Sequence, residues 1–91
     1  MKRLKIIAAG KVQGVAFRFF ASNQANQWGL TGWVQNKPDG TVELEAQGEK
    51  DTLHQFLAFL ENGPSPSSRT DELVHYEIDV KENEQRFSVR S

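Results

Sequence analysis

Two short segments of this sequence carry residue types that could act on a phosphoryl group. The first is Gly10–Arg18, in which Gly10 and Gly14 permit backbone conformations that other residues resist. Successive N–H groups in such a loop can turn toward one point, and a following helix adds its own free N–H groups and positive dipole end. That arrangement suits an oxyanion, most often a phosphate. Arg18 adds a forked, permanently charged donor at the edge of the loop.

The second segment ends at Asn36, whose carboxamide can both accept a hydrogen bond from water and donate one. Loop amides and Arg18 would bind a phosphoryl group and stabilise the charge on its equatorial oxygens. Asn36 would then hold a water in line with the phosphorus. No strong base is needed if the leaving group is good, as a carboxylate leaving from an acyl phosphate is. The same residues also fit a plain glycine turn, a solvated arginine and a turn-initiating asparagine.

The elements that position these segments can be predicted from hydrophobic periodicity. The nearly continuous apolar run Leu4–Ala9 predicts a strand that ends at the glycine loop, and the next stretch predicts a helix from about Phe17 to Trp28. Its residues at helical spacing are expected to pack in the core: Phe17, Phe20, Ala21, Ala25 and Trp28. Leu30–Asn36 and Thr41–Gln47 then predict two strands of a hairpin around a Pro-Asp-Gly turn.

The second half of the chain predicts a helix and two further strands. Apolar residues spaced as on one helix face follow Gly48: Leu53, Phe56, Leu57 and Leu60. The polar, proline-containing stretch Ser65–Asp71 is expected to be a surface loop. A strand over about Leu73–Val80 and a short closing strand at Arg86–Arg90 complete the order.

This order predicts an α+β fold, a ferredoxin-like α/β sandwich with β-α-β-β-α-β order and a short fifth strand. The expected architecture is one antiparallel sheet with both helices on one face. The first helix crosses over between the first two strands, so these strands should be parallel to each other. Their C-terminal ends then lie at the same end of the sheet, which brings Asn36 toward Arg18 and the loop amides.

Length and composition limit the possible classes of protein. The 91 residues are enough for one small domain, expected over residues 1–91, and 37% of them are hydrophobic. The net charge of −1, without a block of like charge, argues against a specialist for nucleic acids or membrane surfaces. Cysteine is absent, which excludes disulfides and thiolate catalysis. The N-terminal apolar run is too short for a signal peptide, so a cytoplasmic protein is expected. A monomer is the default expectation for its oligomeric state.

Two signatures in this order resemble the acylphosphatase family. The segment Gly10–Arg18 is similar to the signature loop of the family, and Gly29–Asn36 is similar to its second signature, with Asp39–Glu43 following. The late Asn62-Gly63-Pro64 is also similar to the family's end of its second helix. The resemblance covers nearly the whole chain, and two spaced signatures are far more specific than one.

The resemblance implies a hydrolase that converts an acyl phosphate to a carboxylate and inorganic phosphate without a cofactor or metal. It implies catalytic roles for Arg18, which would bind the phosphate, and for Asn36, which would position the attacking water. Inorganic phosphate would be both product and competitive ligand. The backbone of Val12–Arg18 would form the phosphate cradle: Val12, Gln13, Gly14, Val15, Ala16, Phe17 and Arg18. Ala16 is a departure from the family, in which many members carry glycine or another small residue, and it matters only if that position needs a positive φ.

Other functions remain open alternatives. A ferredoxin-like domain can instead be a non-catalytic binding module for phosphorylated ligands or RNA, with Trp33 as the one plausible stacking platform. His54 and His75 lack ligand spacing; His54 is expected on the exposed side of its helix and His75 on the solvent-facing side of its strand. Glu43 and Glu45 share a polar strand face and are expected to be solvated.

Overall fold

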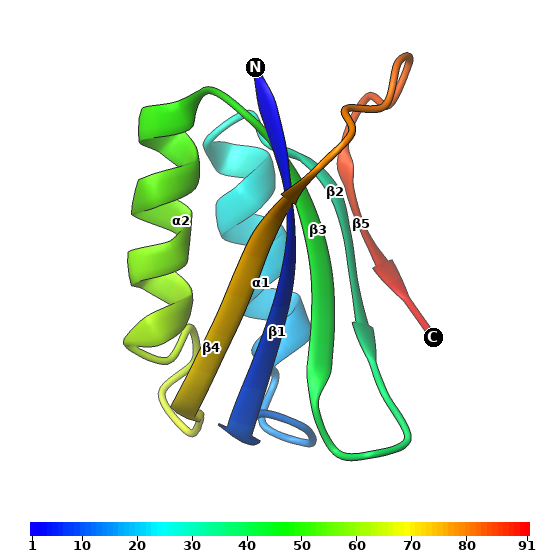
Figure 1. Ribbon diagram of the computed structural model, residues 1–91. Helices are drawn as coiled ribbons and strands as arrows, with labels where there is room; N and C mark the ends of the chain where they lie inside the picture. Colours follow the sequence, from blue (N-terminus) through cyan, green and yellow to red (C-terminus); the bar gives the residue numbers. More distant parts are fainter.

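The computed structural model describes all 91 residues, which form five strands and two helices (Figure 1). The bounds are Lys2–Lys11 (β1), Phe17–Gln27 (α1), Thr31–Asn36 (β2), Val42–Gly48 (β3), Lys50–Glu61 (α2), Arg69–Ile78 (β4) and Phe87–Arg90 (β5). Neither helix has the length and the apolar run that crossing a membrane requires.

The five strands form one sheet in the order β4-β1-β3-β2-β5. β3 is antiparallel to both β1 and β2, so β1 and β2 run in the same direction, as predicted. Their C-terminal ends lie at the lower end of the sheet in Figure 1, where α1 begins. The β-α-β-β-α-β order therefore places the glycine loop and the end of β2 at the same edge.

The core lies between the sheet and the two helices, which cover one face. Sixteen buried residues form this single cluster, with contributions from both helices and the helix-facing side of the strands. The apolar stripe predicted for α2 is buried as expected: Leu53, Phe56, Leu57 and Leu60. The stripe predicted for α1 is correct at Phe17, Ala21 and Ala25, and Trp28 packs against the core. Phe20 is different, because 37% of it is exposed.

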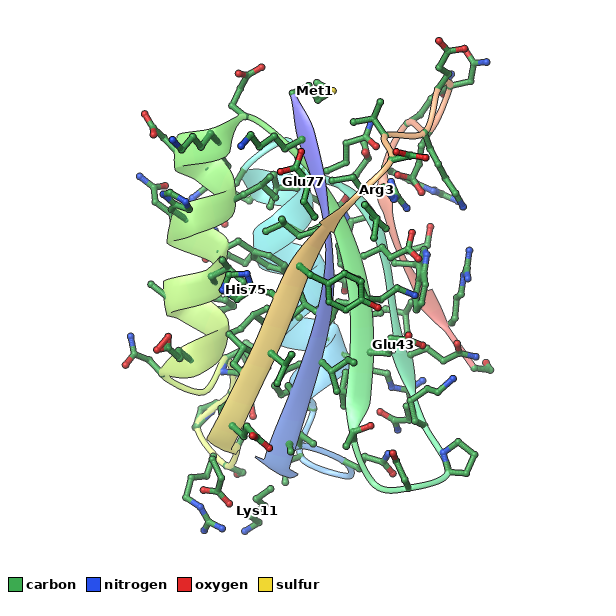
Figure 2. The ribbon with its side chains drawn as sticks, in the orientation of Figure 1. Met1, Arg3, Lys11, Glu43, His75 and Glu77 are labelled. Carbon is green, nitrogen blue, oxygen red and sulfur yellow. The ribbon has the colours of Figure 1, made fainter.

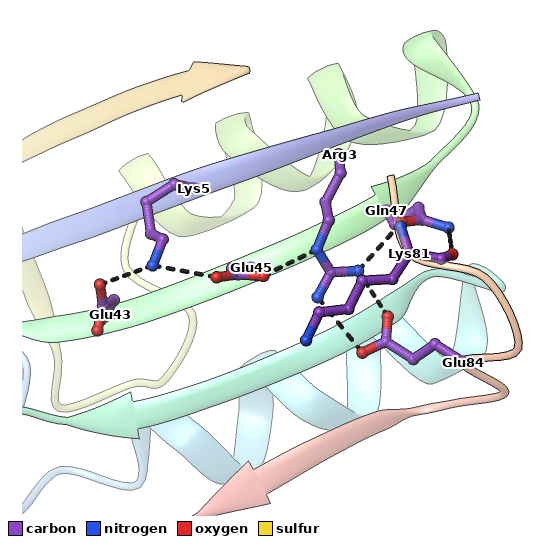
Figure 3. Close-up of polar contacts among 7 residues, drawn as sticks. All are labelled: Arg3, Lys5, Glu43, Glu45, Gln47, Lys81 and Glu84. Atoms are coloured by element: carbon purple, nitrogen blue, oxygen red, sulfur yellow. Dashed lines mark hydrogen bonds and ion pairs between the residues drawn. The ribbon is translucent and has the colours of Figure 1, made fainter. Parts of the chain in front are cut away.

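The helix-free face of the sheet is covered by a network of charged side chains (Figure 3). Arg3 is fully buried; its Nε donates to Oε1 of Glu45 at 2.8 Å, and its Nη1 donates to Oε1 of Glu84 at 2.7 Å. The Nζ of Lys5 lies 3.0 Å from a carboxylate oxygen of Glu43 and 3.0 Å from one of Glu45. The expectation that both glutamates are solvated is wrong, because the Glu45 side chain is only 12% exposed.

These contacts set the protonation of the network. Burial by itself raises the pKa of Glu43, Glu45 and Glu84, but hydrogen bonds and positive charge outweigh it. The pKa of each carboxyl group is therefore lowered, by Lys5 at Glu43, by both cations at Glu45 and by Arg3 at Glu84. The carboxylates stay ionised, so each buried positive charge keeps its partners.

Three predictions about the last third of the chain need correction. The sheet is mixed, because β5 pairs with β2 in parallel. The stretch Ser65–Asp71 is not wholly a surface loop: Ser65 is buried, and β4 begins at Arg69, where it extends the pairing with β1. β4 also ends at Ile78, two residues before the predicted end.

The fourth correction concerns His75, which is exposed as expected but lies on the helix side of β4 rather than on the helix-free face. Its partner across the ladder is Ile6, a core residue, and cross-strand partners share a face. Figure 2 shows His75 on β4 beside α2. There it lines a small cavity together with His54, which is exposed as predicted.

Candidate active site

A cavity of about 300 Å³ opens at the edge where β1 and β2 end and α1 begins. Six of the residues predicted for the site line it: Val12, Gly14, Ala16, Phe17, Arg18 and Asn36. The structure therefore brings Arg18 and Asn36, which are 18 positions apart, to one cavity together with the glycine loop. Two predicted residues, Gln13 and Val15, do not line the cavity, but each takes part in a hydrogen bond that connects the loop to another part of the fold.

The loop presents backbone donors that the protein itself does not use. The N–H groups from Gln13 to Phe19 donate no hydrogen bond to any backbone or side-chain acceptor of the chain. The last of these groups belong to the first turn of α1, where the helix dipole is positive. Most of these groups belong to residues that line the cavity, and free donors at a helix N-terminus form an environment for an anion with several oxygen atoms.

Two residues have a left-handed backbone that gives the loop its shape. Gly14 has φ 71°, and Ala16 has φ 63° with ψ 20° immediately before α1. Position 16 thus has the positive φ at which a residue other than glycine matters. A Cβ in this conformation costs about 1–2 kcal/mol. The loop retains this conformation because its neighbours hold it in place.

Two side chains, one from the loop and one from the segment before β4, fasten the loop to the rest of the fold. The Nε2 of Gln13 donates to the carbonyl oxygens of Lys37 and Thr41, at 2.8 Å each, and so ties the loop to the β2–β3 turn. The buried Ser65 donates through Oγ to the carbonyl oxygen of Val15 at 2.6 Å. No sequence signal singles out Ser65, because its partner lies 50 positions away.

Arg18 is held beside the cavity by the end of the chain. Its Nη1 donates to the carbonyl oxygen of Arg90 in β5 at 2.8 Å. The hydrogen bond uses one of the five guanidinium N–H groups and leaves the others free for a ligand. Arg18 is the only charged side chain among the residues that line the cavity.

Asn36 has an unsatisfied polar atom. Its Oδ1 is buried and has no hydrogen-bond partner in the protein. Buried polar atoms of native proteins nearly always have a partner, so an orphaned acceptor on a residue that lines a cavity indicates a donor, such as a ligand or water, from outside the protein. The chemistry of Asn36 thus fits a group that orients a water beside the anion site.

Two apolar side chains complete the cavity, and the sequence reasoning missed both. Phe19 is 59% exposed and Val89, on β5, is 50% exposed, and each lines the cavity. Phe19 follows Arg18 directly, so its place beside the loop could have been found from the sequence. Val89 could not, because only the pairing of β5 with β2 brings it there.

Two other kinds of site, a metal site and a platform for RNA bases, find little support in the structure. No three His, Asp or Glu side chains gather in a way that could hold a metal ion. Trp33, the possible RNA platform, is 5% exposed and lies beneath Lys5 Nζ and the Arg90 guanidinium, at 5.3 Å and 4.3 Å from its ring centroid. A ring covered in this way is not available for stacking a base.

Known proteins share the sequence pattern and the fold of this chain. The sequence profile of the acylphosphatase family matches residues 4–89. The acylphosphatase of Leuconostoc mesenteroides subsp. mesenteroides is 41% identical over 90 residues, and that of Bacillus licheniformis is 40% identical over 89 residues; these alignments cover 99% and 98% of both chains, respectively. The crystal structure of acylphosphatase from Bacillus subtilis matches over all of both chains, with a TM-score of 0.94 and 38% identity. The predicted ferredoxin-like fold and class of enzyme are confirmed, and the chain belongs to the acylphosphatase family.

Proposed function

We propose that this protein hydrolyses the carboxyl–phosphate bond of small acyl phosphates, with Arg18 and the loop amides as the phosphoryl site and Asn36 as the residue that positions water. The observation that carries the proposal is the convergence of three unsatisfied groups on one cavity. These are the free N–H groups of the loop, the unused donors of Arg18, and the buried, unpartnered Oδ1 of Asn36.

The chemistry follows from what the lining can and cannot supply. The loop amides and Arg18 neutralise the phosphoryl oxygens and stabilise the charge that builds on them in the transition state. A water that donates to Asn36 Oδ1 attacks phosphorus on the side opposite the carboxylate. The new P–O bond forms as the old P–O bond breaks, and the carboxylate leaves with the bonding electron pair.

The proton of the attacking water has one basic acceptor nearby. The lining contains no carboxylate and no imidazole, so the protein offers no general base there. The water proton therefore passes to a phosphoryl oxygen of the substrate. A carboxylate is a good leaving group at neutral pH and needs no protonation, so the products are a carboxylate and inorganic phosphate.

The test is the hydrolysis of benzoyl phosphate in the presence of EDTA, with wild type beside Arg18→Ala. We expect chelator-resistant turnover in the wild type and a loss of at least about 100-fold in kcat/KM in the variant, because a charge-assisted phosphoryl contact is removed. Arg86→Ala is the matched control, since Arg86 is exposed and its side chain has no partner. A folded wild type without turnover would refute the proposal.

The second candidate is a domain that binds acyl phosphates or phosphate without turning them over. The free loop amides favour it as much as they favour catalysis, because they require only an anion. Calorimetric titration with inorganic phosphate separates the two candidates. Phosphate binding without hydrolysis of any acyl phosphate would favour the silent binder, whereas binding together with turnover agrees with the enzyme.

A further inference from the structure

We infer that Phe19 and Val89 form a subsite for the acyl end of the substrate. This subsite favours acyl groups that are small, uncharged and apolar, such as the benzoyl group. The inference rests on the proposed function for the phosphoryl end of the same cavity. It starts from the two apolar residues of the lining that are neither core residues nor parts of the phosphate loop.

Both side chains are exposed at the cavity. Phe19 is 59% exposed and Val89 is 50% exposed, although the other two large apolar residues of the cavity lining, Val12 and Phe17, are buried. Large apolar side chains that gather at the mouth of a cavity mark a surface that a ligand can cover. They lie beside the loop amides, and an acyl phosphate extends its acyl group outward from the phosphoryl group that those amides would bind.

The fold also holds Phe19 and Val89 in place. Val89 pairs with Val34 across β2 and β5, and because cross-strand partners share a face, Val89 points to the helix side, where α1 lies. At one end of the strand, Arg18 Nη1 donates to the Arg90 carbonyl oxygen. At the other end, Asn26 bonds both the N–H and the C=O of Phe87 at 2.8 and 3.0 Å. The two residues therefore face the cavity from elements that are tied together.

The charge of the cavity lining and the cavity volume limit which acyl groups the subsite can take. The only charged side chain of the lining is Arg18, which the phosphoryl group engages in the proposed mechanism. A carboxylate on the acyl group would find no partner and would lose hydration against apolar carbon. The cavity volume of about 300 Å³ is at the lower end of the range of ligand sites, about 300–1,000 Å³, so the acyl group must be small.

The experiment separates the acyl end from the phosphoryl end. Rates with benzoyl phosphate and acetyl phosphate give the preference during turnover, and calorimetric titration with phenylphosphonate and methylphosphonate gives it without any reaction. We expect the wild type to favour the aryl compound of each pair by about fivefold or more. Phe19→Ala should abolish this preference by lowering kcat/KM for benzoyl phosphate and the affinity for phenylphosphonate, and Phe19→Leu should retain part of it.

Two controls sharpen the result. Tyr76→Ala removes an aromatic ring that is exposed to a similar extent on β4, away from the cavity, and should change neither preference. The compound 4-carboxyphenylphosphonate adds only a carboxylate to the aryl group and should bind more weakly than phenylphosphonate.

The outcomes distinguish this inference from the proposed function. Equal affinity for the two phosphonates in the wild type, or an aryl preference that survives in Phe19→Ala, overturns the subsite even if acyl phosphates are hydrolysed. An aryl preference in binding that disappears in Phe19→Ala supports the subsite even if no substrate is hydrolysed, and in that case only the proposed hydrolysis fails.

Discussion

Asn36 is the residue whose role can be separated most sharply from phosphate binding. We predict that Asn36→Ala lowers kcat by about 100- to 1,000-fold, because the attacking water loses its acceptor, while inhibition by inorganic phosphate changes little. Steady-state kinetics with phosphate as competitive inhibitor measure both quantities. If phosphate inhibition disappeared and kcat were unchanged, Asn36 would belong to the phosphate site and the water-positioning role would be wrong.

Ala16 and Gly14 give a matched pair at the level of the backbone. Both have a left-handed conformation, at φ 63° and φ 71°, and a Cβ at Gly14 would meet no atom within 4 Å. We predict that Ala16→Gly stabilises the protein by about 0.5–1 kcal/mol, and that Gly14→Ala destabilises it by about 1 kcal/mol. Urea denaturation measures both effects. Changes of the same sign in the two variants would contradict the backbone argument.

At the scale of elements, the short terminal strand β5 depends on α1 for its position. Its register with β2 spans only four residue pairs, and Asn26 supplies two further hydrogen bonds by contacting the N–H and C=O groups of the buried Phe87. These bonds matter for the site because β5 carries Val89 and the carbonyl oxygen that holds Arg18.

We therefore predict that Asn26→Ala destabilises the protein by about 1–2 kcal/mol, because two backbone groups lose their partner. It should also reduce kcat/KM, since Arg18 loses its anchor when β5 detaches. Thermal unfolding and hydrogen exchange at Phe87 measure the first effect. Asn23→Ala is the control: Asn23 is exposed on the same helix without a hydrogen-bond partner, so its loss should cost less than about 0.5 kcal/mol.

At the scale of the whole molecule, the charged network of the helix-free face joins β1, β3 and the segment between β4 and β5 (Figure 3). The pKa values of Glu43, Glu45 and Glu84 are lowered there, because positive charge outweighs burial. A carboxyl group whose pKa is lower in the folded than in the unfolded state stabilises the fold above the unfolded value, about 4.3. That contribution is lost as the pH falls through the lower, folded pKa.

The predicted result is a free energy of unfolding that falls below about pH 4.5. Glu84→Gln should flatten this dependence, and at pH 7 it should cost about 1–3 kcal/mol because the buried Arg3 loses a charged partner. Urea unfolding between pH 3 and pH 7 measures both effects. Glu72→Gln, at an exposed position of β4 outside the network, should leave the acid dependence unchanged, and an equal flattening in that variant would contradict the assignment.

The sequence by itself determined the order of the elements, the helix-covered face and the meeting of the glycine loop with Asn36. These follow from local causes: alternation of apolar residues along strands, helical spacing of the α2 stripe, glycine at turns, and the parallel crossover through α1. Such causes act within about a dozen residues, so each element can be recognised from a short segment of the sequence. The order of these elements along the chain then predicts the topology.

Only the tertiary structure decided the features that depend on contacts between distant residues. Arg3 and Glu84 are 81 positions apart, Arg18 and Arg90 are 72 apart, and Val15 and Ser65 are 50 apart. No local pattern predicts these pairs, because the sequence around each residue indicates only a strand, a loop or an exposed position and not its distant partner. The same reason applies to the parallel β5, the early start of β4 and the position of Val89 beside the cavity, since strand pairing and packing, rather than composition, place them.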